Sequence, residues 1–190
     1  MGGRGSSGDR GSSSYTSLNS ERESEAFFED AVYDWKQNLN NREESSISEY
    51  TMYNNKDINE YLRDGKISNF EEDELKTQVK DIELGISKFD LKENAIFYRA
   101  GASNIDREFK SFVSATTSRA QAESYLQRDA DTLYVIQASK GKGKGAYVAS
   151  VSEVPEEQEF LFNRGLKPNV VNRSTQSING KKIKVVTIKL

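Results

Sequence analysis

Two glutamates separated by one residue have the clearest chemical potential in this sequence. Glu157 and Glu159 lie in the run "SEVPEEQEFLFNRG" at 152–165, where four acidic residues precede the apolar segment 160–162. Side chains alternate along an extended strand, so the spacing predicts both carboxylates on one face about 7 Å apart, with Gln158 pointing away. Such a pair suits chemistry at an anomeric carbon, because one carboxylate stabilises an oxocarbenium-like transition state and the other handles a proton. A solvated acidic loop is the ordinary alternative.

Two more polar groups stand on predicted strands. Arg99 ends the apolar run 95–100, where an arginine is either an edge-strand surface residue or a guanidinium fork for phosphate. Ser114 and Thr116 share one face of the next predicted strand, 109–116, where hydroxyls are either ordinary strand residues or part of a site. Each group has an ordinary explanation alone, and their combination predicts a functional site.

The chain contains no cysteine and no histidine. This composition removes disulfides, thiolate nucleophiles and zinc-thiolate sites. It also removes the Ser-His-Asp triad, the imidazole general base and histidine as a metal ligand. We therefore expect no metal, and we expect any chemistry to depend on acidic, basic and hydroxyl side chains.

Length and charge predict one domain that binds neither nucleic acid nor membrane. The chain has 190 residues, 35% hydrophobic and 30% charged, which is enough for one core. Its 27 basic and 30 acidic residues give a net charge of -3, so no basic field favours nucleic acid or anionic lipid. No apolar run reaches the roughly 18 residues that span a bilayer, and no apolar signal segment opens the chain. We expect a soluble monomer that acts in a cell cytoplasm.

A change in composition near residue 19 predicts a tail followed by one domain. Residues 1–18 are rich in Gly and Ser and nearly free of large apolar side chains. Such a segment cannot bury enough surface to offset its ordering entropy, so we expect it to be flexible. Residues 19–190 form the predicted catalytic domain.

The predicted domain changes from helical to strand periodicity halfway along. Ser20 with Glu23, and Ser68 with Glu71, match the capping-box pattern. Apolar spacing predicts helices over 20–39, 46–53, 55–65 and 68–86. Short β-branched or aromatic runs then predict strands over 95–100, 109–116, 132–138, 145–150, 159–162 and 181–190, with one helix over 118–128. Helices followed by mostly antiparallel strands indicate an α+β fold.

The order of these groups resembles the R-S-E class of mono-ADP-ribosyltransferases. A Tyr98-Arg99 strand end, a Phe-x-Ser-x-Thr strand at 112–116 and a Glu-x-Glu after a Gly-containing turn follow one another as in that class. The segment "YTMYNNKDINEYLR" at 50–63 is similar to a helix of actin-modifying binary-toxin subunits and Rho-modifying exoenzymes. The segment "GAYVASVSEVPEEQEFLFNRG" at 145–165 resembles their active-site turn. The resemblance extends over residues 20–190.

The resemblance implies two packed, mainly antiparallel sheets with helices at one side and NAD in the cleft between the sheets. It implies that Arg99 binds the NAD phosphates and the nicotinamide ribose, and that Ser114 orients Glu159. It further implies that Glu159 hydrogen-bonds the ribose 2′-hydroxyl as nicotinamide departs, while Glu157 engages the acceptor. Further NAD contacts are implied for Asn59, Arg63 and Thr116. Additional candidates are Tyr53, Tyr125 and Arg128.

The implied activity is transfer of one ADP-ribose from NAD to a protein side chain by a bacterial or phage effector or toxin. Glu157 favours arginine as acceptor, because a carboxylate can orient a guanidinium and draw off its charge. Diphtheria-type enzymes and poly-ADP-ribose polymerases use histidine where this chain has Arg99, so neither subclass fits. An NAD glycohydrolase, with water as acceptor, and a non-catalytic interaction module on the same fold remain open.

Overall fold

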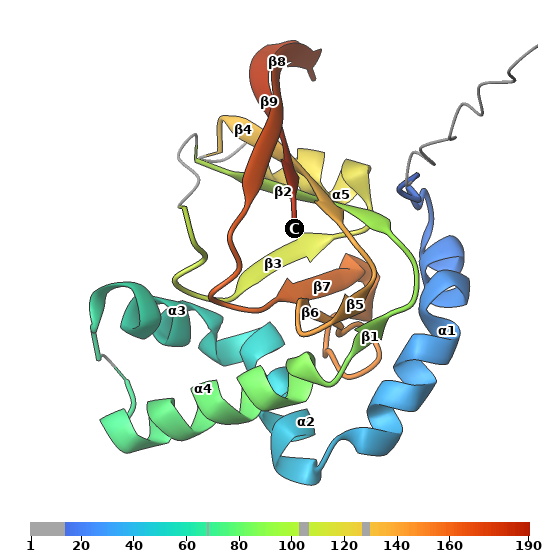
Figure 1. Ribbon diagram of the computed structural model, residues 1–190. Coiled ribbons are helices and arrows are strands. Elements are labelled where there is room, and N and C mark those ends of the chain that lie inside the picture. The colour runs from blue at the N-terminus through green and yellow to red at the C-terminus, as the bar shows by residue number, and fades with distance from the viewer. Residues whose placement is uncertain (1–13, 68, 103–106, 127–129) are drawn as a thin grey trace, which may run out of the picture.

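Helices form one half of the molecule and strands form the other (Figure 1). The computed structural model describes residues 14–67, 69–102, 107–126 and 130–190. The first helices are α1 (Glu21–Asn38), α2 (Asn41–Glu49), α3 (Asn55–Asp64) and α4 (Glu72–Ser87). A π-helical segment, Tyr50–Asn54, joins α2 to α3, and a short helix, α5 (Arg119–Tyr125), lies among the strands.

The start of α1 and the end of α3 lie at the residues that the sequence predicted. The Glu23 backbone N–H donates to the Ser20 hydroxyl over 3.2 Å, so Ser20 is the N-cap of α1. Phe28 and Trp35 are buried along one face of this helix. Gly65 ends α3 at φ 68°, a left-handed conformation that glycine adopts without steric cost.

Two predicted helix starts were wrong. The helix predicted over 46–53 begins at Asn41, because the Asn40 and Glu43 side chains form a capping box that reasoning from apolar spacing missed. The predicted second capping box does not begin α4, whose N-cap is Glu71 without a side-chain cap bond. Ser68, the other half of that pattern, lies outside the described residues.

The strands pair into one long sheet and one short antiparallel pair. The long sheet has the order β6-β7-β3-β2-β4-β9-β8, and all neighbours are antiparallel except β4 and β9. Its strands are β2 (Ala95–Gly101), β3 (Val113–Thr116), β4 (Thr132–Ala138), β6 (Gly145–Tyr147), β7 (Glu159–Phe162), β8 (Asn169–Ile178) and β9 (Lys181–Lys189). The short pair is β1 (Asp90–Leu91) with β5 (Gly141–Lys142). The predicted α+β class with mainly antiparallel strands is confirmed, and the sheet does not close into a barrel.

The long sheet consists of two halves that meet at a corner. β2 and β3 pair through a single residue couple, Tyr98 with Thr116. On one side of this corner lie β3, β7 and β6, and on the other lie β2, β4, β9 and β8. The two packed sheets implied by the sequence resemblance are thus joined into one strand order. Because residues near the corner face both halves, side chains from β2, β3 and β7 can converge there.

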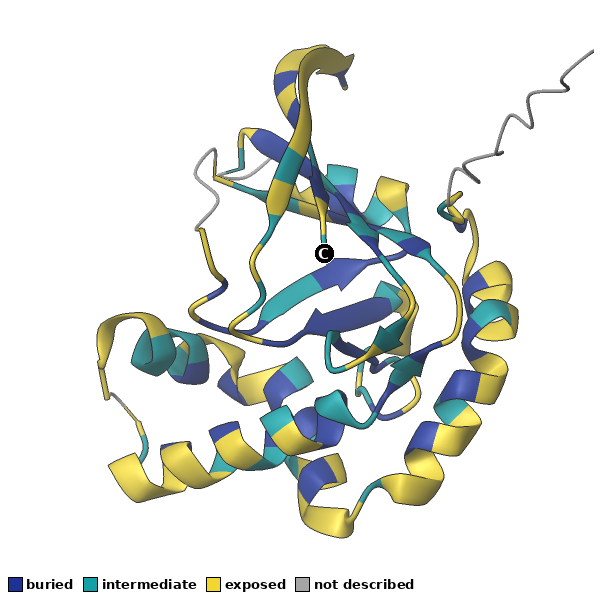
Figure 2. Cartoon of the chain, in the orientation of Figure 1, coloured by how far each residue is buried: buried dark blue, intermediate teal, exposed yellow. Residues whose placement is uncertain are grey.

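β7 is buried on both faces, which explains why the acidic run passes directly into apolar residues. Its residues Phe160 and Phe162 are inaccessible to solvent, and the ring of Phe160 lies 4.3 Å from that of Phe97 in β2. The aromatic cluster continues to Phe28 of α1, and Figure 2 shows β7 in the dark blue of buried residues. Aromatic contacts of this kind add about 0.5–1.5 kcal/mol each beyond burial alone. The apolar strand therefore anchors the acidic turn that precedes it.

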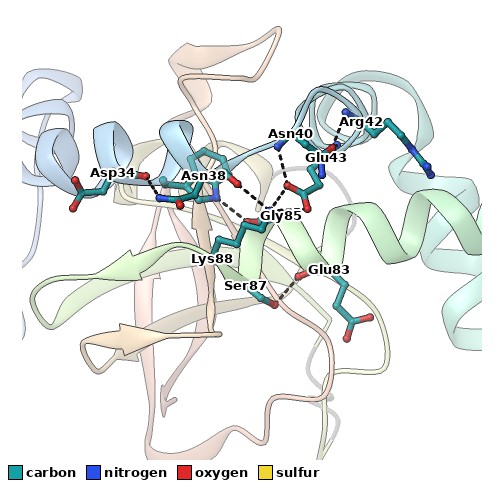
Figure 3. A network of polar contacts seen from close by, with 10 residues as sticks. Asp34, Asn38, Asn40, Arg42, Glu43, Glu83, Gly85, Ser87 and Lys88 are labelled. Atoms are coloured by element: carbon teal, nitrogen blue, oxygen red, sulfur yellow. Dashed lines mark hydrogen bonds and ion pairs between the residues drawn. The ribbon is translucent and has the colours of Figure 1, made fainter.

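A polar network joins α1, α2 and α4 (Figure 3). Glu43 of α2 is buried and accepts from Lys88 Nζ over 2.6 Å, while Trp35 Nε1 donates to the Gly85 carbonyl over 2.8 Å. A Cβ added at Gly85 would come within 2.8 Å of Ile47 Cδ1, so glycine permits close approach of α2 and α4. A buried charge without its partner is strongly unfavourable, so this pair holds α2 against α4. The π-helical segment that follows α2 is fixed as a consequence.

The end of the predicted tail contacts the sheet. The Thr16 carbonyl accepts from the Ile96 N–H over 2.9 Å, and the Thr16 N–H donates to the Asn94 carbonyl over 3.0 Å. Leu18 is only 5% exposed and belongs to the main core. Residues 1–13 of the predicted tail lie outside the described residues. Because Thr16 and Leu18 contact the sheet and the core, we propose that the boundary of the domain lies before residue 14.

Two truncations test this boundary. Removal of residues 1–18 eliminates the Thr16 hydrogen bonds and the burial of Leu18, so we expect a loss of about 3 kcal/mol in the free energy of unfolding. Removal of residues 1–13 alone should leave the midpoint of thermal unfolding nearly unchanged. Thermal unfolding of both variants beside the full chain measures the difference. Equal midpoints for the two truncations would contradict the boundary.

Candidate active site

A pocket of about 570 Å³ lies at the corner of the sheet. Its wall is formed by the π-helical segment and α3, the end of β2, β3, α5 and the turn that precedes β7. Small-molecule sites usually enclose about 300–1,000 Å³. The pocket brings together all three polar groups that the sequence singled out.

Arg99 enters the pocket from β2 and is tied to the adjacent strand. Its Nη1 donates a hydrogen bond to the backbone carbonyl of Ser114 in β3. Desolvation by the surrounding protein lowers the pKa of the Arg99 guanidinium from its ordinary value. Electrostatic interactions with Tyr50 and Glu159 raise this pKa. A guanidinium nevertheless stays charged at neutral pH, and its five N–H donors exceed what Ser114 accepts. The site therefore presents a fixed cation suited to an anionic substrate.

Glu159 is a buried carboxyl at the first position of β7. Only 7% of the residue is exposed, and the strand register pairs it with Thr116 of β3. Burial raises the pKa of Glu159 to about 7, and the nearby charge of Glu157 acts in the same direction. A hydrogen-bonding interaction with Ser114 and the charge of Arg99 lower the pKa and partly offset these effects. Glu159 thus lies within the influence of the residues that the sequence predicted to surround it.

Both glutamates line the pocket, but not through the predicted strand alternation. Glu157 ends a 3₁₀ turn, Pro155–Glu157, and Gln158 adopts a left-handed conformation with φ 49° and ψ 46°. The extended Glu157-Gln158-Glu159 geometry expected from the sequence is therefore wrong, because the strand begins only at Glu159. The turn nonetheless leaves both carboxylates on the pocket wall. Tyr125 of α5 donates its hydroxyl to Glu157 Oε1 over 2.9 Å.

Tyr50 is a pocket residue that the sequence reasoning missed. It is 1% exposed, and its hydroxyl accepts from Asn59 Nδ2 over 2.8 Å. Burial raises the pKa of Tyr50 to about 12, so the phenol is neutral under ordinary conditions. Tyr53, which was a candidate instead, is 70% exposed and is not part of the pocket wall. The π-helical segment carries both tyrosines, and it directs Tyr50 rather than Tyr53 inward.

Asn59, Arg63 and Thr116 lie on the pocket wall in different settings. Arg63 Nη1 donates to Ser111 Oγ over 3.4 Å, and Asn59 Oδ1 is buried without a hydrogen-bond partner among the described residues. A buried acceptor of this kind is expected to find a donor, which a bound molecule can supply. The Thr116 hydroxyl accepts from the Ser118 N–H over 3.0 Å, so it also shapes the turn into α5. Arg128 lies outside the described residues.

A smaller cavity of about 190 Å³ adjoins the main pocket. Arg63 and Arg99 line both cavities, and Lys110 lines the smaller one. Three cations beside a pair of carboxylates suit a substrate that carries phosphates and a glycosidic bond. Within the described ranges, no group of three or more acidic residues is arranged to hold a metal ion. In that same part of the chain, no helix is both long and apolar enough to span a bilayer.

The raised pKa of Glu159 leads to a prediction about stability and pH. Folding favours the protonated carboxyl, so its contribution to stability is present below the ordinary pKa of 4.5 and is lost as pH rises towards about 7. Glu159→Gln removes this loss. We expect the variant to unfold at a higher temperature than the wild type at pH about 8, with little advantage at pH about 4.5. Thermal unfolding measured across this pH range tests the prediction, and a variant that is less stable at the higher pH would contradict it.

Comparison with known proteins places this geometry in context. The family model described as ADP-ribosyltransferase exoenzyme matches residues 24–108 and 101–190. A curated protein of Enterococcus faecalis, NAD(+)–arginine ADP-ribosyltransferase EFV, is 30% identical over 145 residues. That match covers 72% of this chain and only 30% of the relative's length.

Solved structures share the fold at low sequence identity. Plx2a, an ADP-ribosyltransferase toxin from Paenibacillus larvae, aligns with a TM-score of 0.78 and 17% identity over 93% of this chain and 98% of that protein. BECa, an ADP-ribosylating toxin from C. perfringens solved with NADH, aligns with a TM-score of 0.80 and 17% identity over 93% of this chain and 49% of BECa. These two similarities show that the chain shares the fold of both toxins.

Proposed function

Because this chain belongs to the ADP-ribosyltransferase exoenzyme family, we propose that it moves one ADP-ribose from NAD to an arginine of a target protein and releases nicotinamide. The observation that carries the proposal is the position of Glu159. This buried carboxyl interacts with Ser114 and Arg99 and shares its pocket with Glu157. A carboxylate held there can stabilise positive charge that develops at a sugar carbon.

Binding of NAD rests on the cationic side of the pocket. Arg99 would hold the phosphates and the nicotinamide ribose, with Arg63 and Asn59 as further contacts from α3. The orphaned Asn59 Oδ1 fits this role, since a ribose hydroxyl or an amide of the substrate can donate to it. Ser114 would orient Glu159, and Thr116 lines the wall beside it. The crystallised relative BECa carries NADH, which supports a nicotinamide dinucleotide as the ligand.

The proposed reaction exchanges one bond at the ribose C1′ carbon. The bond to the nicotinamide nitrogen breaks, and its electron pair leaves with nicotinamide, which becomes neutral. Glu159 in its carboxylate form stabilises the oxocarbenium-like ribose. A guanidine nitrogen of the target arginine then bonds to C1′, and its proton passes to Glu157.

Arginine is the acceptor that Glu157 fits best. A protonated guanidinium is a poor nucleophile, so attack requires a carboxylate that orients it and accepts its proton. The curated relative from Enterococcus faecalis carries arginine in its name, which supports the same acceptor here.

The proposal includes the extent of the catalytic domain, which begins before α1 and continues to residue 190. It also includes action in a cell cytoplasm.

Nicotinamide release separates this proposal from its alternatives. Purified protein with NAD should release nicotinamide, and release should be accompanied by modification when an arginine-containing protein is added. Nicotinamide release without any protein modification would favour an NAD glycohydrolase. NAD binding without release would favour a non-catalytic module, and failure to bind NAD would overturn the proposal.

A further inference from the structure

A cluster of three polar side chains, Ser24, Thr117 and Gln158, lies beside the acidic turn and outside the pocket, and the first two are buried. Gln158 Oε1 accepts from Thr117 Oγ1 over 3.0 Å and from Ser24 Oγ over 3.1 Å. The Ser24 and Thr117 hydroxyl oxygens lie 2.8 Å apart. Neither Ser24 nor Thr117 is accessible to solvent. The cluster thereby connects α1, the residue after β3 and the residue between the two glutamates.

Each hydroxyl in the cluster has only one proton to donate. Ser24 Oγ also lies 3.0 Å from the Ser20 carbonyl, one turn earlier in α1. The Ser24 proton can therefore go to the Ser20 carbonyl or to the Gln158 amide oxygen, whereas Thr117 Oγ1 can donate to that amide oxygen in either case. Buried hydroxyls are costly when unpaired, so the cluster favours one position of the Gln158 side chain.

The backbone at Gln158 is held by main-chain hydrogen bonds beside the contacts of its side chain. A residue with a Cβ adopts a left-handed conformation only where its surroundings favour it. The Gln158 carbonyl accepts from the Thr117 N–H over 3.3 Å, and the Gln158 N–H donates to the Pro155 carbonyl over 3.0 Å. This conformation separates the 3₁₀ turn that carries Glu157 from the strand that begins at Glu159.

We propose that Ser24, Thr117 and Gln158 are positioning residues that set the two glutamates for the reaction, with α1 as their support. The inference rests on the proposed function, because it assigns a role within the same site. None of the three touches the pocket, so each acts through the turn rather than on the substrate. Misplacement of a reacting group by about 1 Å can reduce turnover by as much as about 10²-fold.

The sharpest variant is Gln158→Asn. Asparagine tolerates the left-handed conformation better than most residues, so the backbone preference is kept. Its side chain is one methylene shorter, which withdraws the acceptor from Ser24 and Thr117. We expect the kcat for nicotinamide release to fall by about 10-fold or more, while the Kd for NAD changes by less than about 3-fold.

Substitutions of the other two cluster residues, Thr117 and Ser24, complete the test. Thr117→Val removes the hydroxyl at similar size and should reduce kcat, whereas Thr117→Ser keeps the hydroxyl and should recover most of that loss. Ser24→Ala should also reduce kcat. The double variant Ser24→Ala with Gln158→Asn should reduce kcat by a smaller factor than the product of the two single-variant factors. Non-additivity of this kind is expected when two residues belong to one network.

Ser87→Ala is the matched control, since it removes a hydroxyl with a similar set of contacts that includes no residue of the acidic turn or of the pocket wall. Ser87 Oγ donates to the Glu83 carbonyl one turn earlier in α4 and accepts from Asn163 Nδ2 over 2.8 Å. The control should lower the thermal midpoint about as much as Ser24→Ala and leave kcat unchanged. A purely structural role for the cluster would make the Ser24 variant behave like this control.

The outcomes separate this inference from the proposed function. If the wild type releases nicotinamide and the Gln158→Asn and Ser24→Ala variants retain its kcat, the positioning role is overturned while the proposed function stands. A loss confined to NAD affinity, with kcat retained, would also overturn it. If the wild type itself releases no nicotinamide, the proposed function fails first, and the inference falls with it.

Discussion

Replacement of Glu159 with glutamine will reduce nicotinamide release and protein modification together, by about 10² or more, with NAD binding largely retained. The substitution keeps the shape of a side chain that is only 7% exposed, and it removes the negative charge. Both water and arginine attack after the ribose has become positive, so both reactions require this carboxylate. Initial rates of nicotinamide release and calorimetric titration with NAD measure the two effects.

Glu156→Gln is the control for this substitution. Glu156 lies in the same turn but is exposed and does not line the pocket. Its replacement changes the net charge by the same amount, so activity close to wild type is expected. Full turnover by the Glu159→Gln protein would contradict the assignment of the chemical step to this residue.

Replacement of Glu157 with glutamine will separate the two reactions that Glu159 supports jointly. Departure of nicotinamide depends on the ribose, whereas attack by a guanidinium needs a second group that accepts a proton. We expect modification of protein arginine to fall below detection while slow NAD hydrolysis continues, because water needs less activation. Parallel assays of released nicotinamide and of modified protein measure the ratio of NAD hydrolysis to protein modification.

Tyr125 makes the same prediction more specific. Its hydroxyl donates to Glu157 Oε1, so the carboxylate is oriented from α5 as well as from the turn. Glutamine at 157 can still accept that hydrogen bond through its amide oxygen, so the variant tests charge and basicity rather than position. Wild-type levels of arginine modification by Glu157→Gln would rule out this role for Glu157.

The parts of the fold that could be predicted are those with local signals. Ser20 and Glu23 predict the start of α1, and Gly65 predicts the end of α3. Both predictions hold because helix capping depends on side chains and backbone conformations close in sequence to the helix end. The buried segment that became β7 was likewise visible as a short aromatic run. In each case the neighbours in sequence are also the physical partners.

β8 was missed because it is an edge strand without an apolar face. Apart from Ile178 at its end, none of its side chains is buried, so the alternation that marks a half-buried strand is absent. The signal lay in the turn instead. Asn179 and Gly180 have φ values of 48° and 76°, and an Asn-Gly pair between two runs favours a tight hairpin.

The predicted site residues of the described chain line one pocket, although the local geometry expected for the two glutamates was wrong. Glu157 and Glu159 were expected on one strand, yet Pro155 begins a 3₁₀ turn and Gln158 reverses the backbone. Proline at the first position of such a turn is a recognisable signal that could have corrected the prediction. Tyr50 could not be predicted to point inward, because a π-helical segment departs from the α-helical register on which such predictions rely.

Mass spectrometry of a cell lysate incubated with the purified protein and NAD tests the central claim most directly. The account predicts ADP-ribose on arginine side chains of one or a few proteins, formed together with released nicotinamide and strongly reduced when Glu159→Gln replaces the wild type. ADP-ribose found only on cysteine, asparagine or a nucleic-acid base would contradict the arginine acceptor. An absence of both modified protein and released nicotinamide would contradict the proposed activity itself.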